Sequence, residues 1–252
     1  MTLDAYVPPR DVASKVRRRL TQSRLARPAR LAFETPLLSI SFDDFPATAA
    51  QDGARILEKH GARGAYYAAA GMLESHGPCG HNFAEEDVRR LISAGHEIGC
   101  HSYAHKNAAQ EDVFATLQDL AKNRDALMAM GAPSPRTHAY PYGETTNRLK
   151  DGLPPRFACA RGVLPGLNHG RTDLAQLRAF ALFGENWTER LRAALTRAAK
   201  RKAWVIAFTH DVSEAPSPWG TRGGDLDALL GAAKRLGFAV LPVTAALERR
   251  LA

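Results

Sequence analysis

The chain has 252 residues, of which 45% are hydrophobic and 24% are charged, and it carries a formal net charge of +8. This composition excludes a small disulfide-stapled domain and leaves room for one large α/β domain or two small ones. Three scattered cysteines argue against a disulfide framework and for a reducing compartment. The N-terminus shows no secretory signal, and no stretch approaches the roughly 18 apolar residues of a membrane span. We therefore expect a cytoplasmic protein, at most peripheral at the inner membrane surface.

Positive charge gathers near the N-terminus. Between residues 10 and 30 the chain holds Lys15 and five arginines, opposed by the single acid Asp11. Such a balance favours anionic partners. We predict that residues 1–30 form a basic N-terminal extension to a catalytic domain that spans residues 31–252.

An amphipathic pattern accompanies this charge. Val12, Val16 and Leu20 recur every four residues and predict a helix over residues 11–26 with one narrow apolar stripe. We expect a solvated helix on the outside of the domain. The alternative is a helix that touches an anionic membrane surface. Nucleic acid is not expected as a partner, because neither interleaved aromatic residues nor a nucleic-acid-binding module accompanies the charge.

After the basic segment, strand and helix patterns alternate to the end of the chain. The predicted strands cover residues 37–42, 64–69, 97–100, 137–140, 157–160, 178–182, 204–208 and 238–242. The predicted helices cover residues 48–60, 84–94, 110–130, 147–151, 186–200, 226–236 and a last segment at the C-terminus. This alternation predicts βαβ units and a mainly parallel sheet, and seven or eight such units can close into a barrel.

Polar side chains follow several of the predicted strands directly. Asp43 and Asp44 follow the first strand, His101 the third, Pro141-Tyr142-Gly143 the fourth and His210 the seventh. In parallel α/β barrels, active sites are built at the carboxyl ends of the strands. The sequence therefore predicts one active site that these residues share.

The residue types indicate a metal site. His101 and His105 are four apart, so a helix or a tight turn would place both imidazoles on one face. With one aspartate they would leave a coordination position open, as catalytic metal sites do. Asp43 and Asp44 point in different directions on a strand unless the backbone bends, so one would bind metal and the other act as a base. The sequence does not say which, and a helix cap or turn pair is the alternative for the aspartates.

Two further segments are candidates with weaker signals. His210, just past an apolar strand, is suited to donate a proton to a leaving group, or else has a structural role. A backbone N–H of the turn at Pro141-Tyr142-Gly143 could stabilise an oxyanion, although the tripeptide alone is only a loop signal. A second zinc site at His76, Cys79 and His81 is not expected, because no second compact pair accompanies these residues.

These motifs resemble a known family, the NodB-type polysaccharide deacetylases of carbohydrate esterase family four. The resemblance extends over residues 36–245. Residues 41–44, Ser-Phe-Asp-Asp, are similar to the first family motif, and residues 95–105, from Gly-His-Glu-Ile-Gly to the two histidines, resemble the second. Pro141-Tyr142-Gly143 is similar to the end of the third motif, and residues 208–210, Phe-Thr-His, to the last.

The resemblance implies a deformed (β/α) barrel with seven or eight units and metal-dependent removal of an N-acyl group from a sugar. It also implies a role for each motif residue: Asp43 as base, Asp44, His101 and His105 as metal ligands, His210 as general acid, and the Tyr142 backbone N–H as oxyanion donor. Zinc is the default ion, although two histidines and one carboxylate also accept iron, cobalt or nickel. His96 lies within the second motif and is expected to be structural.

The third motif departs from the family pattern. Many family members begin it with an arginine that orients the base, whereas this chain has Ala139. Either Arg161 or Arg136 would then serve the base, or no arginine does.

Two other positions also differ. Phe45 stands where glycine is frequent in the family, and we expect it to narrow the mouth of the pocket. The aspartate that usually tunes the acid histidine is not identifiable from the sequence; Asp173 and Asp211 are the candidates.

The sequence thus predicts a metal-dependent hydrolase that removes an N-acetyl group from an N-acetylated sugar through metal-bound water. The substrate would be an oligosaccharide, a polysaccharide or a lipid-linked glycan. The alternatives are a related amidase or deformylase that acts on another C–N amide bond, and a catalytically silent carbohydrate-binding protein on the same fold.

Overall fold

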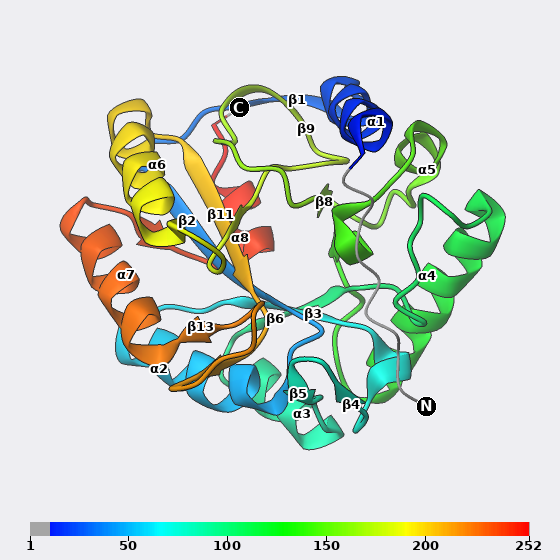
Figure 1. Ribbon diagram of the computed structural model, residues 1–252, viewed down its shortest axis with the longest axis horizontal. Coiled ribbons are helices and arrows are strands. Elements are labelled where there is room, and N and C mark those ends of the chain that lie inside the picture. Colours follow the sequence, from blue (N-terminus) through cyan, green and yellow to red (C-terminus); the bar gives the residue numbers. More distant parts are fainter. Residues whose placement is uncertain (1–10, 252) are drawn as a thin grey trace.

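A computed structural model describes residues 11–251. Its main sheet follows the order β10-β11-β2-β3-β6-β7-β8, β14 also pairs with β2, and every pair in it is parallel. These strands are β2 (Leu37–Asp43), β3 (Ala65–Ala68), β6 (Glu97–Cys100), β7 (Thr137–Ala139), β8 (Cys159–Arg161), β10 (Phe180–Ala181), β11 (Trp204–Thr209) and β14 (Ala239–Val240). The sheet curls, and helices cover its outer side (Figure 1).

The helices follow the predicted order. They are α1 (Val12–Ser23), α2 (Ala54–Lys59), α3 (Glu85–Ser93), α4 (Val113–Ala129), α5 (Asn147–Gly152), α6 (Trp187–Arg201), α7 (Gly223–Arg235) and α8 (Val243–Glu248). Short turns of other types are η1 (Ala49–Gly53), which leads into α2, η2 (Ala70–Met72) and η3 (Pro141–Gly143). Within residues 11–251, no helix has both the length and the apolar character needed to cross a membrane.

The strand β2 separates two hydrophobic clusters. Leu38, Ile40 and Phe42 pack in the larger cluster, together with side chains of α2, α6 and α7. The odd-numbered positions point to the opposite face, because side chains alternate along a strand. Leu37 belongs to the second cluster, together with Trp204 of β11. The same alternation directs Asp43, the last residue of β2, toward this second cluster.

The sheet closes through an irregular segment. Between β8 and β10, residues 174–179 run beside β8, where Ala160 N–H donates to the Leu174 carbonyl (2.7 Å) and Gly162 N–H to the Leu177 carbonyl (3.0 Å). The segment then continues into β10. The predicted deformed parallel barrel is confirmed, and the deformation lies where this segment replaces a regular strand.

Three small two-stranded sheets were not predicted. The strand β1 (Pro28–Leu31) pairs with β9 (Gly170–Asp173) and β4 (His76–Gly77) with β5 (Gly80–His81), both antiparallel, and β12 (Val212–Ser213) pairs in parallel with β13 (Thr221–Arg222). Their residues show no clear apolar run or alternation that would indicate a strand. The predicted domain boundary lies between residues 30 and 31, within β1. Residues on both sides of it therefore belong to one strand of the fold, and the boundary itself stays a prediction.

The helix α1 packs beside α5 through a buried lysine (Figure 1). The Lys150 side chain is fully buried, and its Nζ donates to the carbonyls of Thr21 and Arg24, both at 2.6 Å. The same nitrogen lies 2.8 Å from Asp173 Oδ2. Burial alone would raise the pKa of Asp173, but hydrogen bonds from Lys150 and from backbone N–H groups lower it. Lys150 therefore ties the end of α1 to the core.

Replacing Lys150 tests this anchor. Lys150→Met removes the cation beside the buried Asp173 carboxylate and the donor to two helix-end carbonyls, so we expect the free energy of unfolding to fall by about 3–5 kcal/mol. The matched control is Arg24→Gln, which removes the exposed ion pair with Asp151 and should leave the urea midpoint almost unchanged. Similar losses in both variants would refute the assigned role of Lys150.

Candidate active site

The strand order brings the predicted site segments together. β11, β2, β3, β6 and β7 are consecutive in the parallel sheet, so their carboxyl ends lie along one edge. Asp43 ends β2, His101 follows β6, the η3 turn follows β7 and His210 follows β11. The only intervening strand, β3, ends at Ala68 and is followed by small, mostly buried residues up to Gly71.

The two adjacent aspartates diverge because the backbone bends between them. Asp44 has φ of +55°, a left-handed conformation that non-glycine residues rarely adopt. Three other residues of this edge share it: Ser102 (+61°), His105 (+50°) and Tyr142 (+58°). Such conformations concentrate at functional sites, where the surrounding structure offsets their cost.

Asp44 faces both histidines of the second motif. Its Oδ1 lies 3.2 Å from His105 Nε2 and 3.5 Å from His101 Nε2, and it is buried without a hydrogen-bond partner. His101 Nδ1 lies 2.8 Å from the Ala139 carbonyl. Because a carbonyl only accepts, Nδ1 carries the proton, and neutral His101 presents the lone pair of Nε2 to Asp44.

His101 brings no positive charge to this cluster. Burial, followed by the nearby His105, holds the pKa of His101 well below its usual range, so its ring stays neutral. Two buried acceptors that face each other, such as Asp44 Oδ1 and His101 Nε2, are stabilised by a cation placed between them. Among residues 11–251, Asp44, His101 and His105 are the only group of three or more potential ligands within reach of one ion, with all donor atoms within 4.8 Å. The set suits a divalent metal ion.

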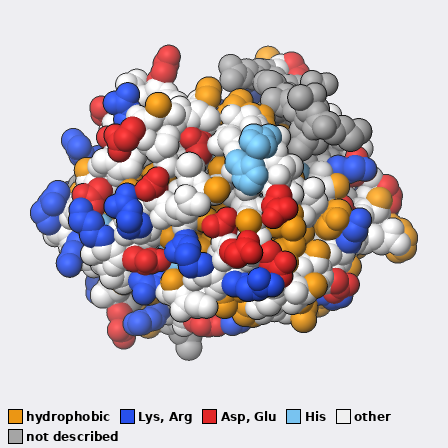
Figure 2. Space-filling model, turned by 90° about the horizontal axis from the view of Figure 1, so that it is seen from below, with side chains coloured by type: hydrophobic (Ala, Val, Ile, Leu, Met, Phe, Trp, Pro, Cys, Tyr) orange, Lys and Arg blue, Asp and Glu red, His pale blue; other side chains and the backbone are white. Residues whose placement is uncertain are grey.

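The region around Cys79 does not offer a second site of this kind within the described chain. His76 and His81 face each other across the β4–β5 hairpin, with ring centroids 4.7 Å apart, and both are exposed. Figure 2 shows histidine side chains standing out together on the face seen from below.

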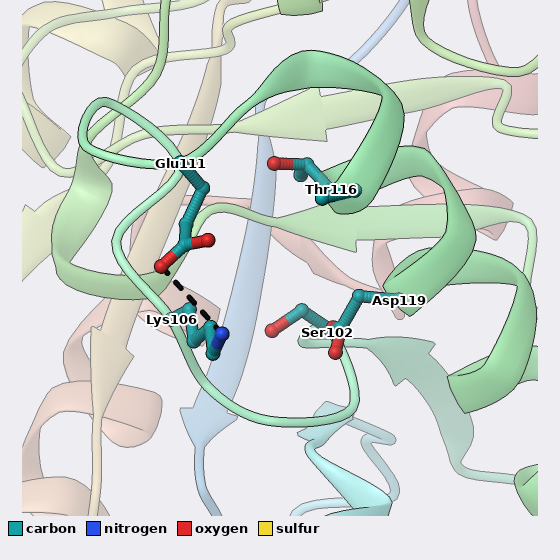
Figure 3. Close-up of a pocket in the computed structure, with 6 residues that line it drawn as sticks. Ser102, Lys106, Glu111, Thr116 and Asp119 are labelled. Carbon is teal, nitrogen blue, oxygen red and sulfur yellow. Dashed lines mark ion pairs between the residues drawn. The ribbon is translucent and has the colours of Figure 1, made fainter.

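The histidine turn is held from behind by α4. Residues 101–107 form no helix, and Asp119 of α4 accepts hydrogen bonds from the N–H groups of Tyr103 (2.6 Å) and Ala104 (3.2 Å). Figure 3 shows Asp119 beside Ser102 in a small pocket between the turn and α4, with the Lys106–Glu111 ion pair across it. Asp119 was not predicted, because its signal in the sequence is that of an ordinary helical acid.

Asp43 forms a buried ion pair with Arg161 of β8. The guanidinium also lies over the rings of Tyr67 (4.7 Å) and Phe208 (5.0 Å). Burial raises the pKa of Asp43, and the charge of Arg161 opposes that rise. Of the two candidate arginines, Arg161 therefore contacts the predicted base. Arg136 instead pairs with Glu248, and both of these side chains are more than half exposed.

The position of Arg161 explains the alanine of the third motif. In the β7–β8 register, Ala139 lies directly beside Arg161. The neighbouring strand thus supplies the guanidinium at the level where the family resemblance predicts one.

His210 is oriented by a backbone carbonyl. Its Nδ1 lies 3.2 Å from the Trp219 carbonyl, so Nδ1 donates and Nε2 is the nitrogen left to face a substrate. Neither candidate aspartate has this role. Asp173 pairs with Lys150, and Asp211 accepts from the N–H (2.8 Å) and hydroxyl of Ser217.

Three further predictions concern Tyr142, His96 and Phe45. The ring of Tyr142 contacts that of His105, with centroids 4.7 Å apart, so the η3 turn adjoins the cluster. His96 is structural, because it accepts from Gly64 N–H (3.0 Å). The prediction for Phe45 was wrong: it is fully buried and stacks on Phe83 in the core, with centroids 4.3 Å apart, rather than lining a pocket mouth.

Comparisons agree with this geometry. Residues 31–153 match the polysaccharide deacetylase family. The peptidoglycan-N-acetylglucosamine deacetylase PgdA of Listeria monocytogenes is 23% identical over 149 residues, which cover 57% of this chain and 30% of that protein. The chain thus spans about a third of the length of this curated relative.

Solved structures share the fold. A family 4 acetyl xylan esterase from Clostridium thermocellum, in complex with a cobalt ion, has a TM-score of 0.60 at 20% identity over 84% of this chain and 90% of its own. The peptidoglycan deacetylase PdaC from Bacillus subtilis gives 0.56 at 16%, over 86% and 92%. A pseudoenzyme of carbohydrate esterase family four from Bacillus anthracis gives 0.57 at 15%, over 87% and 68%.

The fold and the site define a deformed parallel barrel with a candidate cation-binding cluster at the carboxyl ends of its strands. By sequence over residues 31–153 and by fold over most of its length, the chain resembles the NodB-type polysaccharide deacetylases, carbohydrate esterase family four.

Metal content tests the cluster. We expect the protein to bind about one divalent ion per chain, and Asp44→Ala to abolish binding because it removes the shared carboxylate. Asp43→Asn should retain the ion, since Asp43 is committed to Arg161. His81→Ala, in the exposed hairpin, is the control for loss of a histidine. Atomic emission after dialysis against a metal buffer measures these contents, and an ion retained by Asp44→Ala would contradict the assignment.

Proposed function

We propose that this protein is a metal-dependent N-deacetylase that hydrolyses the acetamide of an N-acetylated sugar to acetate and a free amine. The observation that carries the proposal is the separation of the two aspartates. The Asp44 carboxylate faces a ring nitrogen of both His101 and His105 in the candidate cation-binding cluster, whereas the neighbouring Asp43 pairs with Arg161. A ligand and a base thus lie side by side, as hydrolysis of an unactivated amide requires.

The chemistry divides among the residues as follows. A divalent ion held by Asp44, His101 and His105 would polarise the acetyl carbonyl and make water more acidic. Asp43 takes a proton from the water that attacks the carbonyl carbon. Its raised pKa makes it a stronger base than an ordinary aspartate, and Arg161 holds its carboxylate in place.

Two groups complete the reaction. As the carbonyl carbon becomes tetrahedral, its oxygen gains negative charge, which the Tyr142 N–H at the left-handed η3 turn is proposed to stabilise. His210 delivers a proton from Nε2 to the sugar nitrogen as the C–N bond breaks. Donation from Nδ1 to the Trp219 carbonyl keeps the ring in that orientation. The products are acetate and the amino sugar.

Zinc is the proposed ion, because two histidines and one carboxylate with an open position are typical of catalytic zinc sites. The related acetyl xylan esterase was solved in complex with a cobalt ion, which supports a divalent ion at the corresponding site here. The names of the relatives, a peptidoglycan deacetylase and a xylan esterase, share removal of acetyl groups from glycans. They support an acetylated sugar without fixing which one.

A silent protein is the second candidate, because a pseudoenzyme shares the fold. Against it, each proposed role has its residue here, and the buried ion pair and the cation-binding cluster both form. A related amidase that acts on another C–N bond would use the same groups, and only substrate tests distinguish it.

Acetate release from N-acetylglucosamine oligomers tests the proposal. We expect Asp44→Ala to lose activity together with the ion. Asp43→Asn and His210→Asn should keep the ion and lose roughly 10²–10⁴-fold in kcat, since each removes a proton-transfer group. His81→Ala should retain full activity. If the metal-loaded wild type releases no acetate from these oligomers or from a panel of other N-acyl sugars, deacetylation is excluded.

The Arg161–Asp43 pair predicts a shift in pH dependence. The positive charge of Arg161 lowers the pKa of Asp43, so Arg161→Met should raise that pKa and move the acid limb of kcat/KM to higher pH. Arg136→Met, at the exposed arginine, is the matched control and should leave the profile in place. Circular dichroism at each pH separates this shift from unfolding. An unchanged acid limb in a folded Arg161→Met variant would show that Arg161 does not tune the base.

A further inference from the structure

The helix α1 faces the wrong way for an ordinary surface helix. Its buried positions are polar: Ser14, Thr21 and Gln22 are each less than a tenth exposed. Its apolar side chains point outward instead, with exposed fractions of 76% for Val12 and 63% for Leu20. A helix that packs on a core normally shows the opposite arrangement.

The orientation of α1 is fixed by specific contacts on its polar side. Gln22 Nε2 donates to the Gln176 carbonyl at 2.8 Å, and Lys150 binds the carbonyl end of the helix. Arg18 Nε lies 2.5 Å from Glu144, which is almost fully buried. The helix therefore cannot rotate its apolar side into the core without breaking these contacts.

Val12, Val16 and Leu20 form the outward stripe, which has no role in the packing of the described chain. Positions four apart lie on one face of a helix, so the three side chains are contiguous along it. Among residues 11–251, the structure gives none of them a place in a hydrophobic cluster. An apolar stripe held outward by polar anchors indicates a surface that binds something else.

Positive charge flanks this stripe. By helical geometry, Lys15 and Arg19 border it on one side and Arg17 on the other. All three side chains are exposed, and no carboxylate of residues 11–251 forms an ion pair with them. The helix itself contains no acidic residue. Apolar side chains between rows of basic ones are the pattern of a helix that lies in the interface of an anionic membrane.

We propose that α1 docks the protein on an anionic lipid surface, with the stripe entering the acyl boundary and Lys15, Arg17 and Arg19 among the headgroups. A second copy of the chain fits less well, because a symmetric contact would bring the same basic side chains against each other. Nucleic acid would leave the apolar stripe unused. The proposal concerns binding and does not depend on the deacetylase activity.

The inward side of α1 is linked to the segment that follows the η3 turn. Arg18 joins α1 to Glu144, two residues after Tyr142. Arg24 and Lys150 join it to α5, which begins at Asn147. The docking stripe lies on the opposite side of the helix from these contacts.

Vesicle cosedimentation tests the proposal. We expect the full chain to bind phosphatidylcholine vesicles that contain phosphatidylglycerol, to bind pure phosphatidylcholine poorly, and to dissociate as salt is raised. Val16→Gln with Leu20→Gln should weaken binding by at least about tenfold, and so should Arg17→Gln with Arg19→Gln. Both pairs are at the surface, so melting temperatures should stay near that of the wild type.

The matched control is Phe114→Gln, at an exposed apolar side chain of α4 outside the stripe, which should bind vesicles as the wild type does. Absence of wild-type binding to the anionic vesicles, or equal binding by the Val16/Leu20 variant, would overturn the proposal. Sedimentation velocity tests the alternative occupant, a second copy of the chain. If the wild type does not bind vesicles but forms a dimer that the Val16/Leu20 variant loses, the stripe is a dimer contact.

Discussion

A buried carboxylate oxygen without a donor is the constraint on which the site depends. Oδ1 of Asp44 faces the lone pair of His101 Nε2, and the neutral state of His101 prevents that ring from supplying the missing proton. Leaving such a buried acceptor unpaired costs roughly 1–3 kcal/mol, and more for a charged group. A divalent cation removes this cost, so the arrangement stores part of the free energy that metal binding recovers.

The residues that hold this arrangement adopt backbone conformations that are unfavourable for them. Four residues at the site hold positive φ, a conformation that residues other than glycine rarely adopt. Within the histidine turn, Asp119 of α4 accepts hydrogen bonds from two backbone N–H groups, and the Ala139 carbonyl fixes the tautomer of His101. These contacts pre-organise the ligands, which lowers the entropy that metal binding would otherwise lose.

The sequence was informative where residues act close to their neighbours in the chain. The alternation of strands and helices predicted the order of the barrel, and the motif residues come together because parallel strands end at one edge. Asp119 and the Trp219 carbonyl were not predicted. Asp119 acts across a loop on residues 15 and 16 positions away, and a backbone carbonyl has no sequence signature. Phe45 was misplaced because its motif position says nothing of which way the side chain turns after the bend at Asp44.

The exchange of arginine for Ala139 shows what the site conserves physically. The buried carboxylate of Asp43 needs a cation at a given place in space, and a parallel sheet offers that place from two adjacent strands at the same register. With alanine on β7, the long side chain of Arg161 can cross from β8 to Asp43, and it gains the rings of Tyr67 and Phe208 as a packing surface. A buried guanidinium without such partners would destabilise the barrel, because the cost of removing its charge from water would exceed the gain from one ion pair. Arg161 therefore depends on the aromatic side chains of β3 and β11 as well as on Asp43. Side chains from four strands, β2, β3, β8 and β11, thus determine the position of the Asp43 carboxylate. A motif confined to any one of these strands does not reveal that position.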